Sequence, residues 1–297
     1  MFVPRETIHT QIYGQPTGEL AHSGDYPAHR PLAAETSRVR ATGSNCGVPI
    51  QNNLFGLPVD AMTMAQAVDR CVEAVEQDQY FTVGVVNAAK IVTMRKNAAL
   101  RQAVADCDMI LADGQSVVWA SRVLHAALPE RIAGIDLFLE LLAVASRRSY
   151  RVYFLGARQE VLTQMLAEIT SRYPDISIAG FRNGYFNADE EELVAADIYE
   201  AKADLLFIAM SSPKKELFLR NWGEKTGVCV VHGVGGSFDI LAGETRRAPI
   251  WYQRHGLEWL YRARQEPIRL GRRYLTTNLA FIRLVAVEYM RLRRLAK

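Results

Sequence analysis

The strongest constraint on the fold is a regular alternation of wholly apolar runs with amphipathic helical patterns between residues 64 and 233. Runs such as FTVGVV (81–86) and DLLFIAM (204–210) are apolar in both side-chain directions, so both faces of a sheet must be covered. The other runs are MILA (109–112), YRVYFLG (150–156), ISIAG (176–180) and VCVVHG (228–233). The alternation predicts an α/β fold with a doubly wound, mostly parallel, Rossmann-like sheet, whose ligands bind at the carboxyl ends of the strands.

Helical patterns separate these runs, and we expect helices at 64–77, 88–105, 115–127, 135–147, 158–172, 189–202 and 214–224. Residues 1–48 are rich in Pro, Gly, Ser, Thr and His and show no periodicity, so we expect a disordered leader. The α/β domain should occupy residues 49–245. Residues 246–297 should form a helical appendage, with helices at 249–265 and about 276–295.

Charge is distributed unevenly along the chain. Residues 246–297 hold 13 Lys and Arg against 3 Asp and Glu, a net charge of +10, which leaves −7 on the rest. A basic segment on an acidic body indicates a polyanionic partner: a membrane surface, a nucleic acid or a phosphate-bearing ligand. The last helix has apolar residues on one side and arginines on another, which suits lying on a bilayer or folding onto the body.

The chain begins without the basic and apolar regions of a signal peptide, and no run of about 18 uncharged apolar residues occurs. We therefore expect a cytoplasmic protein. Four cysteines lie far apart with no metal-binding spacing, which predicts reduced thiols. The literal DxD of Asp106 and Asp108 precedes its strand, at the wrong end for the site, so we interpret it as a solvated loop and expect no metal.

Asp113 is the leading candidate for chemistry. In LADGQSVVW it follows a strand and precedes a helix, so its carboxylate should lie at the carboxyl edge of the sheet. The helix dipole favours the ionised form, which suits a general base. The structural alternative is an Asp that only caps the helix.

Two polar residues lie near other turns of this kind. Asn87, in VVNAAKIV, also follows a strand, where it can cap a helix or present its amide to a substrate. Arg131, in PERIAG, lies in a loop between helices, where a solvated arginine is the plain alternative.

Glycine-rich and proline turns follow three more strands. Gly156 allows a backbone or a phosphate to come close. Pro213 opens a helix whose first turn holds two lysines, Lys214 and Lys215, a placement that a bound anion or simple solvation would relieve. VHGVGGSFDILAG contains Gly235, Gly236 and Asp239, which can cradle a pyrophosphate and bind a hydroxyl, or form only a tight turn.

Several of these stretches together resemble the WecG/TagA/CpsF family of bacterial glycosyltransferases. The resemblance runs from about Phe55 to Tyr274 and rests on the Asn87 segment, LADG, ERIAGIDL, YFLG, GFRNGYF, SSPKKE, GVGGSFDILAG, RRAP and GLEWLYRARQEPIRLGRRY. The last three blocks that carry it are long, ordered and unusual.

The resemblance implies transfer of a sugar, with inversion, from a UDP-sugar to a polyprenyl-diphosphate-linked saccharide in cell-surface or exopolysaccharide synthesis. It implies that Asp113 is the catalytic base and that Asn87, Arg131 and Asp239 line the substrate pocket. We also expect the donor to be bound by residues of the turns that follow the strands: Gly156, Pro213, Lys215, Gly235 and Gly236. The predicted contacts to acceptor diphosphate or UDP come from the arginines of the appendage, which bind phosphate bidentately: Arg247, Arg262, Arg269, Arg272 and Arg273.

The implied partners are thus a UDP-sugar, the lipid-linked acceptor and the inner face of the plasma membrane, with no cofactor, metal or nucleic acid. Val85 stands where the family often has Thr, and Lys215 where it has Gln, so the donor sugar stays open. The acceptor saccharide, the linkage and the oligomeric state, a homo-oligomer included, stay open as well. The alternatives are a nucleotide-cofactor-dependent oxidoreductase, which lacks its glycine fingerprint here, and a nucleic-acid-binding protein, which leaves the glycine-rich turns unexplained.

Overall fold

A computed structural model of the chain describes residues 50–265, 267 and 271–295. The predicted leader, 1–48, lies outside the described residues. The strands are β1 (Gln51–Leu54), β2 (Leu57–Asp60), β3 (Phe81–Val86), β4 (Met109–Ala112), β5 (Arg151–Gly156), β6 (Ser177–Arg182), β7 (Leu205–Ala209) and β8 (Val230–Gly233). The first two form an antiparallel hairpin, and the other six form one sheet in the order β4-β3-β8-β7-β5-β6.

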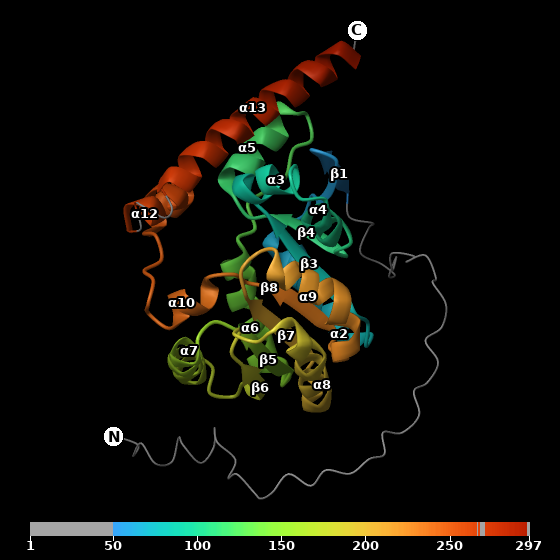
Figure 1. Cartoon of the computed structure of the whole chain (residues 1–297), viewed down its shortest axis with the longest axis vertical. Helices are drawn as coiled ribbons and strands as arrows, with labels where there is room; N and C mark the ends of the chain where they lie inside the picture. The colour runs from blue at the N-terminus through green and yellow to red at the C-terminus, as the bar shows by residue number, and fades with distance from the viewer. Residues whose placement is uncertain (1–49, 266, 268–270, 296–297) are drawn as a thin grey trace, which may run out of the picture. The chain divides into compact units, whose positions relative to one another are not determined.

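The helices before the C-terminal segment are α2 (Met64–Glu76), α3 (Ala88–Met94), α4 (Ala98–Ala105), α5 (Gln115–Val123), α6 (Gly134–Arg148), α7 (Gln159–Arg172), α8 (Glu191–Ala201), α9 (Lys214–Trp222) and α10 (Ser237–Leu241). Short 3-10 helices occur at η1 (Ala188–Glu190) and η2 (Gly223–Thr226). Figure 1 shows these helices around the sheet.

All strand pairs of the six-stranded sheet are parallel, and both of its faces are covered, as predicted. Successive residues of β4 show the two faces clearly. Met109 and Leu111 join the core beneath α2, α6 and α7, whereas Ile110 and Ala112 join the core beneath α3, α4 and α5. The doubly wound α/β prediction is therefore confirmed.

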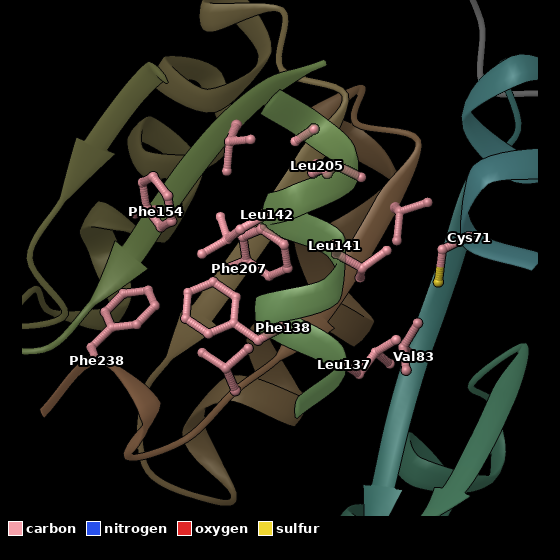
Figure 2. Close-up of a cluster of buried hydrophobic side chains, with 14 of the residues drawn as sticks. Cys71, Val83, Leu137, Phe138, Leu141, Leu142, Phe154, Leu205, Phe207 and Phe238 are labelled. Carbon is pink, nitrogen blue, oxygen red and sulfur yellow. The ribbon is translucent and has the colours of Figure 1, made fainter. Parts of the chain in front are cut away.

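Aromatic rings fill the centre of the first of these cores. Phe138 of α6 lies with its ring centroid 4.6 Å from that of Phe207 of β7, and Phe154 and Phe238 pack around the pair (Figure 2). All four side chains are buried. This packing holds α6 and α10 against the sheet, and both helices begin at its carboxyl edge.

The elements before the C-terminal segment differ from expectation in two places. The helix expected over 88–105 is two helices, because Asn97 begins a new one by accepting a hydrogen bond from the Leu100 N–H at 2.9 Å. The β1–β2 hairpin was not expected at all. Its Asp60 carboxylate accepts a hydrogen bond from the Ile110 N–H at 2.7 Å, which ties the hairpin to β4.

The C-terminal segment is helical and consists of α11 (Ile250–Arg254), α12 (Glu258–Gln265) and α13 (Arg272–Leu295). The single helix expected over 249–265 was wrong, because the chain turns at Gly256, whose φ is +66°, and divides it into α11 and α12. α13 packs along α3, with Phe281 buried and its ring centroid 5.5 Å from that of Phe55 (Figure 1). The other side of α13 exposes Leu279, Ile282 and Met290. One face of this helix therefore belongs to the core and the other does not. Among the described residues, no helix combines the length and apolarity needed to cross a bilayer.

Candidate active site

The carboxyl ends of β4, β3 and β8 are neighbours in the sheet, and the leading candidate residues follow them directly. The Asp113 N–H donates to the Val86 carbonyl at 2.9 Å, so the turn after β4 lies against the end of β3. The Ile132 N–H donates to the Ala112 carbonyl at 3.1 Å, which brings the Arg131 loop to the same place. The sheet thus gathers Asp113, Asn87 and Arg131 at one edge.

Asp113 is not a helix cap. The N-cap residue of α5 is Gly114, without a side-chain cap hydrogen bond, so the structural alternative for Asp113 was wrong. Asp113 is half-buried, and the protein atoms around its carboxyl raise the pKa of Asp113 to about 6, against the pull of Arg131. Burial therefore opposes the helix dipole, which we expected to favour the ionised form of this carboxyl. A carboxyl with a pKa near 6 is well matched to proton transfer near neutral pH.

Three further charges act on Asp113. Glu258 of α12 raises the pKa of the Asp113 carboxyl, whereas Arg262 of α12 and Lys90 of α3 lower it. Lys90 and Glu258 could not be singled out from the sequence, because no local pattern links them to Asp113. The structure brings Arg262, one of the predicted phosphate-binding arginines, into the surroundings of the candidate base.

Asn87 caps α3, as one of its two interpretations expected. Its Oδ1 accepts a hydrogen bond from the Lys90 N–H at 3.0 Å. Asn87 also lies against the turn after Asp113, because a Cβ built on Gly114 would come within 3.4 Å of the Asn87 Cβ. The cap therefore fixes this amide beside the candidate base.

Arg131 is not a solvated arginine, and that alternative was wrong. Its side chain is only 14% exposed, and its Nη1 lies 2.5 Å from the Glu258 Oε2. A longer contact, 3.8 Å, joins its Nη2 to the Asp136 Oδ2. Asp136 also pairs with Arg247, the first of the predicted appendage arginines. These ion pairs join the start of α6 to the C-terminal segment.

The other appendage arginines are less fully described. Arg269 lies outside the described residues. Arg272 and Arg273 begin α13, and only their place in the helix is described. Their predicted role in binding phosphate remains a prediction.

Gly156 meets protein backbone. Its φ is +130°, and a Cβ built there would lie 2.4 Å from the Ala209 carbonyl oxygen, so only glycine fits between β5 and β7. Gly156 therefore allows the neighbouring strand β7 to come close to the end of β5.

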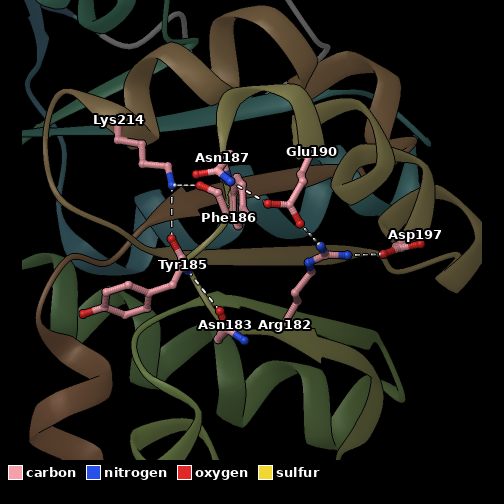
Figure 3. A network of polar contacts seen from close by, with 9 residues as sticks. Arg182, Asn183, Tyr185, Phe186, Asn187, Glu190, Asp197 and Lys214 are labelled. Atoms are coloured by element: carbon pink, nitrogen blue, oxygen red, sulfur yellow. Dashed lines mark hydrogen bonds and ion pairs between the residues drawn. The ribbon is translucent and has the colours of Figure 1, made fainter.

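Lys214 is held by the protein. Its Nζ donates to the Phe186 and Gly184 carbonyl oxygens at 2.8 and 3.2 Å, and it lies 4.0 Å from the centroid of the Phe186 ring (Figure 3). Neither a bound anion nor simple solvation is needed to explain this lysine. Pro213, just before it, is exposed and forms the N-cap position of α9.

Lys215 belongs to a buried charged cluster that the sequence did not reveal. Glu216 Oε1 lies 2.5 Å from the Lys215 Nζ and 3.1 Å from the Lys90 Nζ, and none of the three side chains is more than 12% exposed. Burial and the nearby Lys90 lower the pKa of Lys215 to about 8. Lys215 also lies close to the end of β8, since a Cβ on Gly233 would come within 2.8 Å of its Cε. Two ammonium groups thus share one carboxylate just below the carboxyl edge.

The glycine-rich turn after β8 leaves open space. Gly235 has a φ of +55°, and no heavy atom of the described chain lies within 4 Å of a Cβ built on it. Asp239 lies close by, because its Oδ2 is 3.8 Å from a Cβ built on Gly236. A ligand could approach the backbone here, in agreement with the donor-binding prediction, which stays a prediction.

The DxD pair has a structural explanation. Asp108 Oδ2 accepts hydrogen bonds from both the N–H and the hydroxyl of Thr82, each at 2.8 Å. The expected solvated loop is thus wrong for Asp108, which ties β4 to the start of β3. These atoms lie at the amino ends of the strands, away from the candidate site.

The fold and the site define a Rossmann-like α/β protein whose Asp113 carboxyl, with a raised pKa, lies near charged side chains at the carboxyl edge of the sheet. A model of the glycosyl transferase WecG/TagA/CpsF family matches residues 52–295. The chain therefore belongs to this family, which confirms the resemblance.

A curated relative extends the comparison. Over 165 residues the chain is 41% identical to the N-acetylglucosaminyldiphosphoundecaprenol N-acetyl-beta-D-mannosaminyltransferase of Bacillus subtilis (strain 168). The match covers 56% of this chain and 64% of the relative, somewhat under two thirds of its length.

Proposed function

We propose that this protein is an inverting glycosyltransferase that moves a sugar from a UDP-sugar to a polyprenyl-diphosphate-linked saccharide. Membership of the family supports sugar transfer, and the name of the B. subtilis relative describes an acceptor linked to undecaprenol through a diphosphate. The observation that carries the proposal is Asp113, a carboxyl with a raised pKa at the carboxyl edge of the sheet.

In the proposed reaction Asp113 accepts the proton of an acceptor hydroxyl. The hydroxyl oxygen then forms a bond to the anomeric carbon of the donor sugar, while the bond from that carbon to the UDP oxygen breaks. The electron pair leaves with UDP, and attack from the opposite side inverts the anomeric carbon. The turn at Gly235 and Gly236 provides room for the donor beside Asp239.

The negative charge of UDP and of the acceptor diphosphate needs cations. Arg131 and Arg262 are near enough to Asp113 to lower the pKa of its carboxyl. Arg247 shares the carboxylate of Asp136 with Arg131 and so belongs to the same ion-pair network. We propose that these arginines, together with Arg269, Arg272 and Arg273, contact phosphate oxygens and stabilise the leaving group without a metal.

We place the reaction at the inner face of the plasma membrane. The solvent-facing side of α13 combines the exposed Leu279, Ile282 and Met290 with Arg283 and Arg291. Apolar side chains among arginines favour binding to an anionic lipid surface, where each arginine contributes about 1 kcal/mol. α13 begins just after α12, so the same segment would bring the acceptor lipid toward Asp113.

The test is acceptor-dependent release of UDP from a panel of UDP-sugars and polyprenyl-diphosphate-linked saccharides. Because Val85 and Lys215 depart from the family pattern, the panel should include glucose, glucuronic acid, N-acetylmannosamine and N-acetylmannosaminuronic acid donors. Release that requires both a donor and a lipid-linked acceptor supports the proposal. Folded protein that binds no UDP would contradict it.

A further inference from the structure

The carboxylate that forms the shortest ion pair with Arg131 comes from the C-terminal segment. Glu258 lies 127 residues further along the chain, yet its Oε2 is 2.5 Å from the Arg131 Nη1. Arg131 is only 14% exposed, so water solvates its guanidinium poorly. The Glu258 carboxylate therefore supplies most of the charge stabilisation that water would otherwise give this buried cation. Asp136 is the more distant acidic neighbour, at 3.8 Å, and it also serves Arg247.

The position of Glu258 is fixed by the turn that precedes it. Gly256 has a φ of +66°, and a Cβ built there would come within 2.5 Å of the Gln115 Cβ and 3.4 Å of the Trp119 ring. Only glycine allows this approach to α5. Since Gln115 begins α5 two residues after Asp113, the first turn of α12 is held beside the candidate base.

The charged groups that act on Asp113 come from three parts of the fold. Arg131 lies in the loop before α6, Lys90 in the first turn of α3, and Glu258 and Arg262 on α12. Glu258 and Arg262 are four residues apart on one helix and act on Asp113 in opposite directions.

We propose that Glu258 is a positioning residue of the transfer site, which holds Arg131 in place beside Asp113 and is supplied by the C-terminal segment. The inference rests on the proposed function and adds to it. The segment would contribute an acidic group that organises the site as well as arginines that bind phosphate.

The physical reason is competition between carboxylates for one guanidinium. While Glu258 holds Arg131, that arginine cannot form a close pair with Asp113, which would weaken Asp113 as a base. The charge of Glu258 itself also raises the proton affinity of Asp113. Loss of Glu258 should therefore make Asp113 more acidic by both routes.

The test is a ¹³C NMR titration of the Asp113 carboxyl in the full-length protein, assigned with Asp113→Asn, for wild type, Glu258→Gln and Arg262→Gln. We expect the pKa of Asp113 to fall by roughly half a unit or more in Glu258→Gln and to rise in Arg262→Gln. The acidic limb of kcat/KM should move the same way in each variant. Glu288→Gln removes a carboxylate of α13 that pairs with Arg291 and should move neither.

The paired variants separate positioning from simple loosening of α12. Loosening would shift the Asp113 pKa in the same direction in both variants, and that result, like an unchanged pKa in Glu258→Gln, would overturn the proposal. If Glu258→Gln does not fold, Glu258→Asp keeps the charge but shortens the reach, and an Asp113 pKa equal to that of wild type together with an unchanged KM would also refute the role in positioning. The titration needs no substrate, so its failure is distinguishable from failure of the transfer reaction.

Discussion

Lys90 of α3 and Glu216 of α9 form an ion pair of 3.1 Å between two helices on the same face of the sheet, and Lys215 joins the same carboxylate oxygen at 2.5 Å. The two lysines lower the pKa of Glu216 to about 2 although burial alone would raise it. The carboxylate is therefore the group that makes two buried ammonium ions tolerable.

Glu216→Gln should destabilise the protein by about 3–5 kcal/mol, the usual cost of leaving a buried charge without its partner. Lys215→Gln should cost much less, because the Lys90–Glu216 pair survives. Urea unfolding at pH 7.5 measures both, with Glu160→Gln on the exposed surface of α7 as the control. A loss below about 1 kcal/mol in Glu216→Gln would show that the cluster is not essential to the fold.

The pH dependence of the reaction follows from the Asp113 pKa of about 6. A base must be ionised, so kcat/KM should rise about tenfold per pH unit below pH 6 and level off above it. Initial rates across pH 4.5–8.5, with folding checked at each end, test this. An acidic limb centred near pH 4 would indicate that the Asp113 carboxyl is not the group that titrates.

Ionisation of Asp113 should lower the unfolding free energy of the protein. Its pKa is higher in the folded protein, about 6, than the ordinary 3.8, so the folded state binds more protons between those values and loses stability as pH rises through that window. Above pH 6 the loss amounts to at most about 3 kcal/mol. Asp113→Asn should therefore raise the unfolding free energy at pH 7.5, and by less at pH 5.

Urea unfolding at the two pH values provides the measurement. Asp175→Asn changes an exposed carboxylate in a turn and should leave the unfolding free energy within about 0.5 kcal/mol of wild type. Equal stabilisation by both variants would mean that the effect is one of net charge and not of the Asp113 site.

The exposed side of α13 should bind lipid. Ile282→Glu combined with Met290→Glu should abolish co-sedimentation with vesicles that contain anionic lipid, because buried apolar contacts are replaced by like-charge repulsion. Thermal stability should hardly change, since both side chains are more than half exposed. Tyr185→Glu, at an exposed position after β6, is the matched control. Undiminished vesicle binding by the double variant would exclude this face as the membrane contact.

Much of the fold could be predicted from the sequence, because wholly apolar runs between helices permit few arrangements. FTVGVV and MILA match β3 and β4 residue for residue. The break between α3 and α4 was missed, since Asn97 gives only a local capping signal inside a continuous helical pattern. The hairpin was missed because its stability comes from Asp60 reaching Ile110, a contact 50 residues away.

The site was predictable where strand ends carry polar residues, and less so elsewhere. Asp113 and Asn87 follow strands that are adjacent in the sheet, so their meeting follows from topology. Glu258 and Glu216 gave no such signal, because Arg131 and Lys90, with which they pair, come from distant segments and only the folded chain brings them together. The direction of the Asp113 pKa was also beyond the sequence, since burial depends on what covers the site.

The most direct test of the central claim compares wild type with Asp113→Asn in the release of UDP from UDP-sugars mixed with polyprenyl-diphosphate-linked saccharides. We expect one donor to give acceptor-dependent release, and the variant to lose about 100-fold or more of that rate while it still binds UDP. Turnover by Asp113→Asn close to that of wild type would contradict the account, because the carboxylate at the end of β4 would then not be the base.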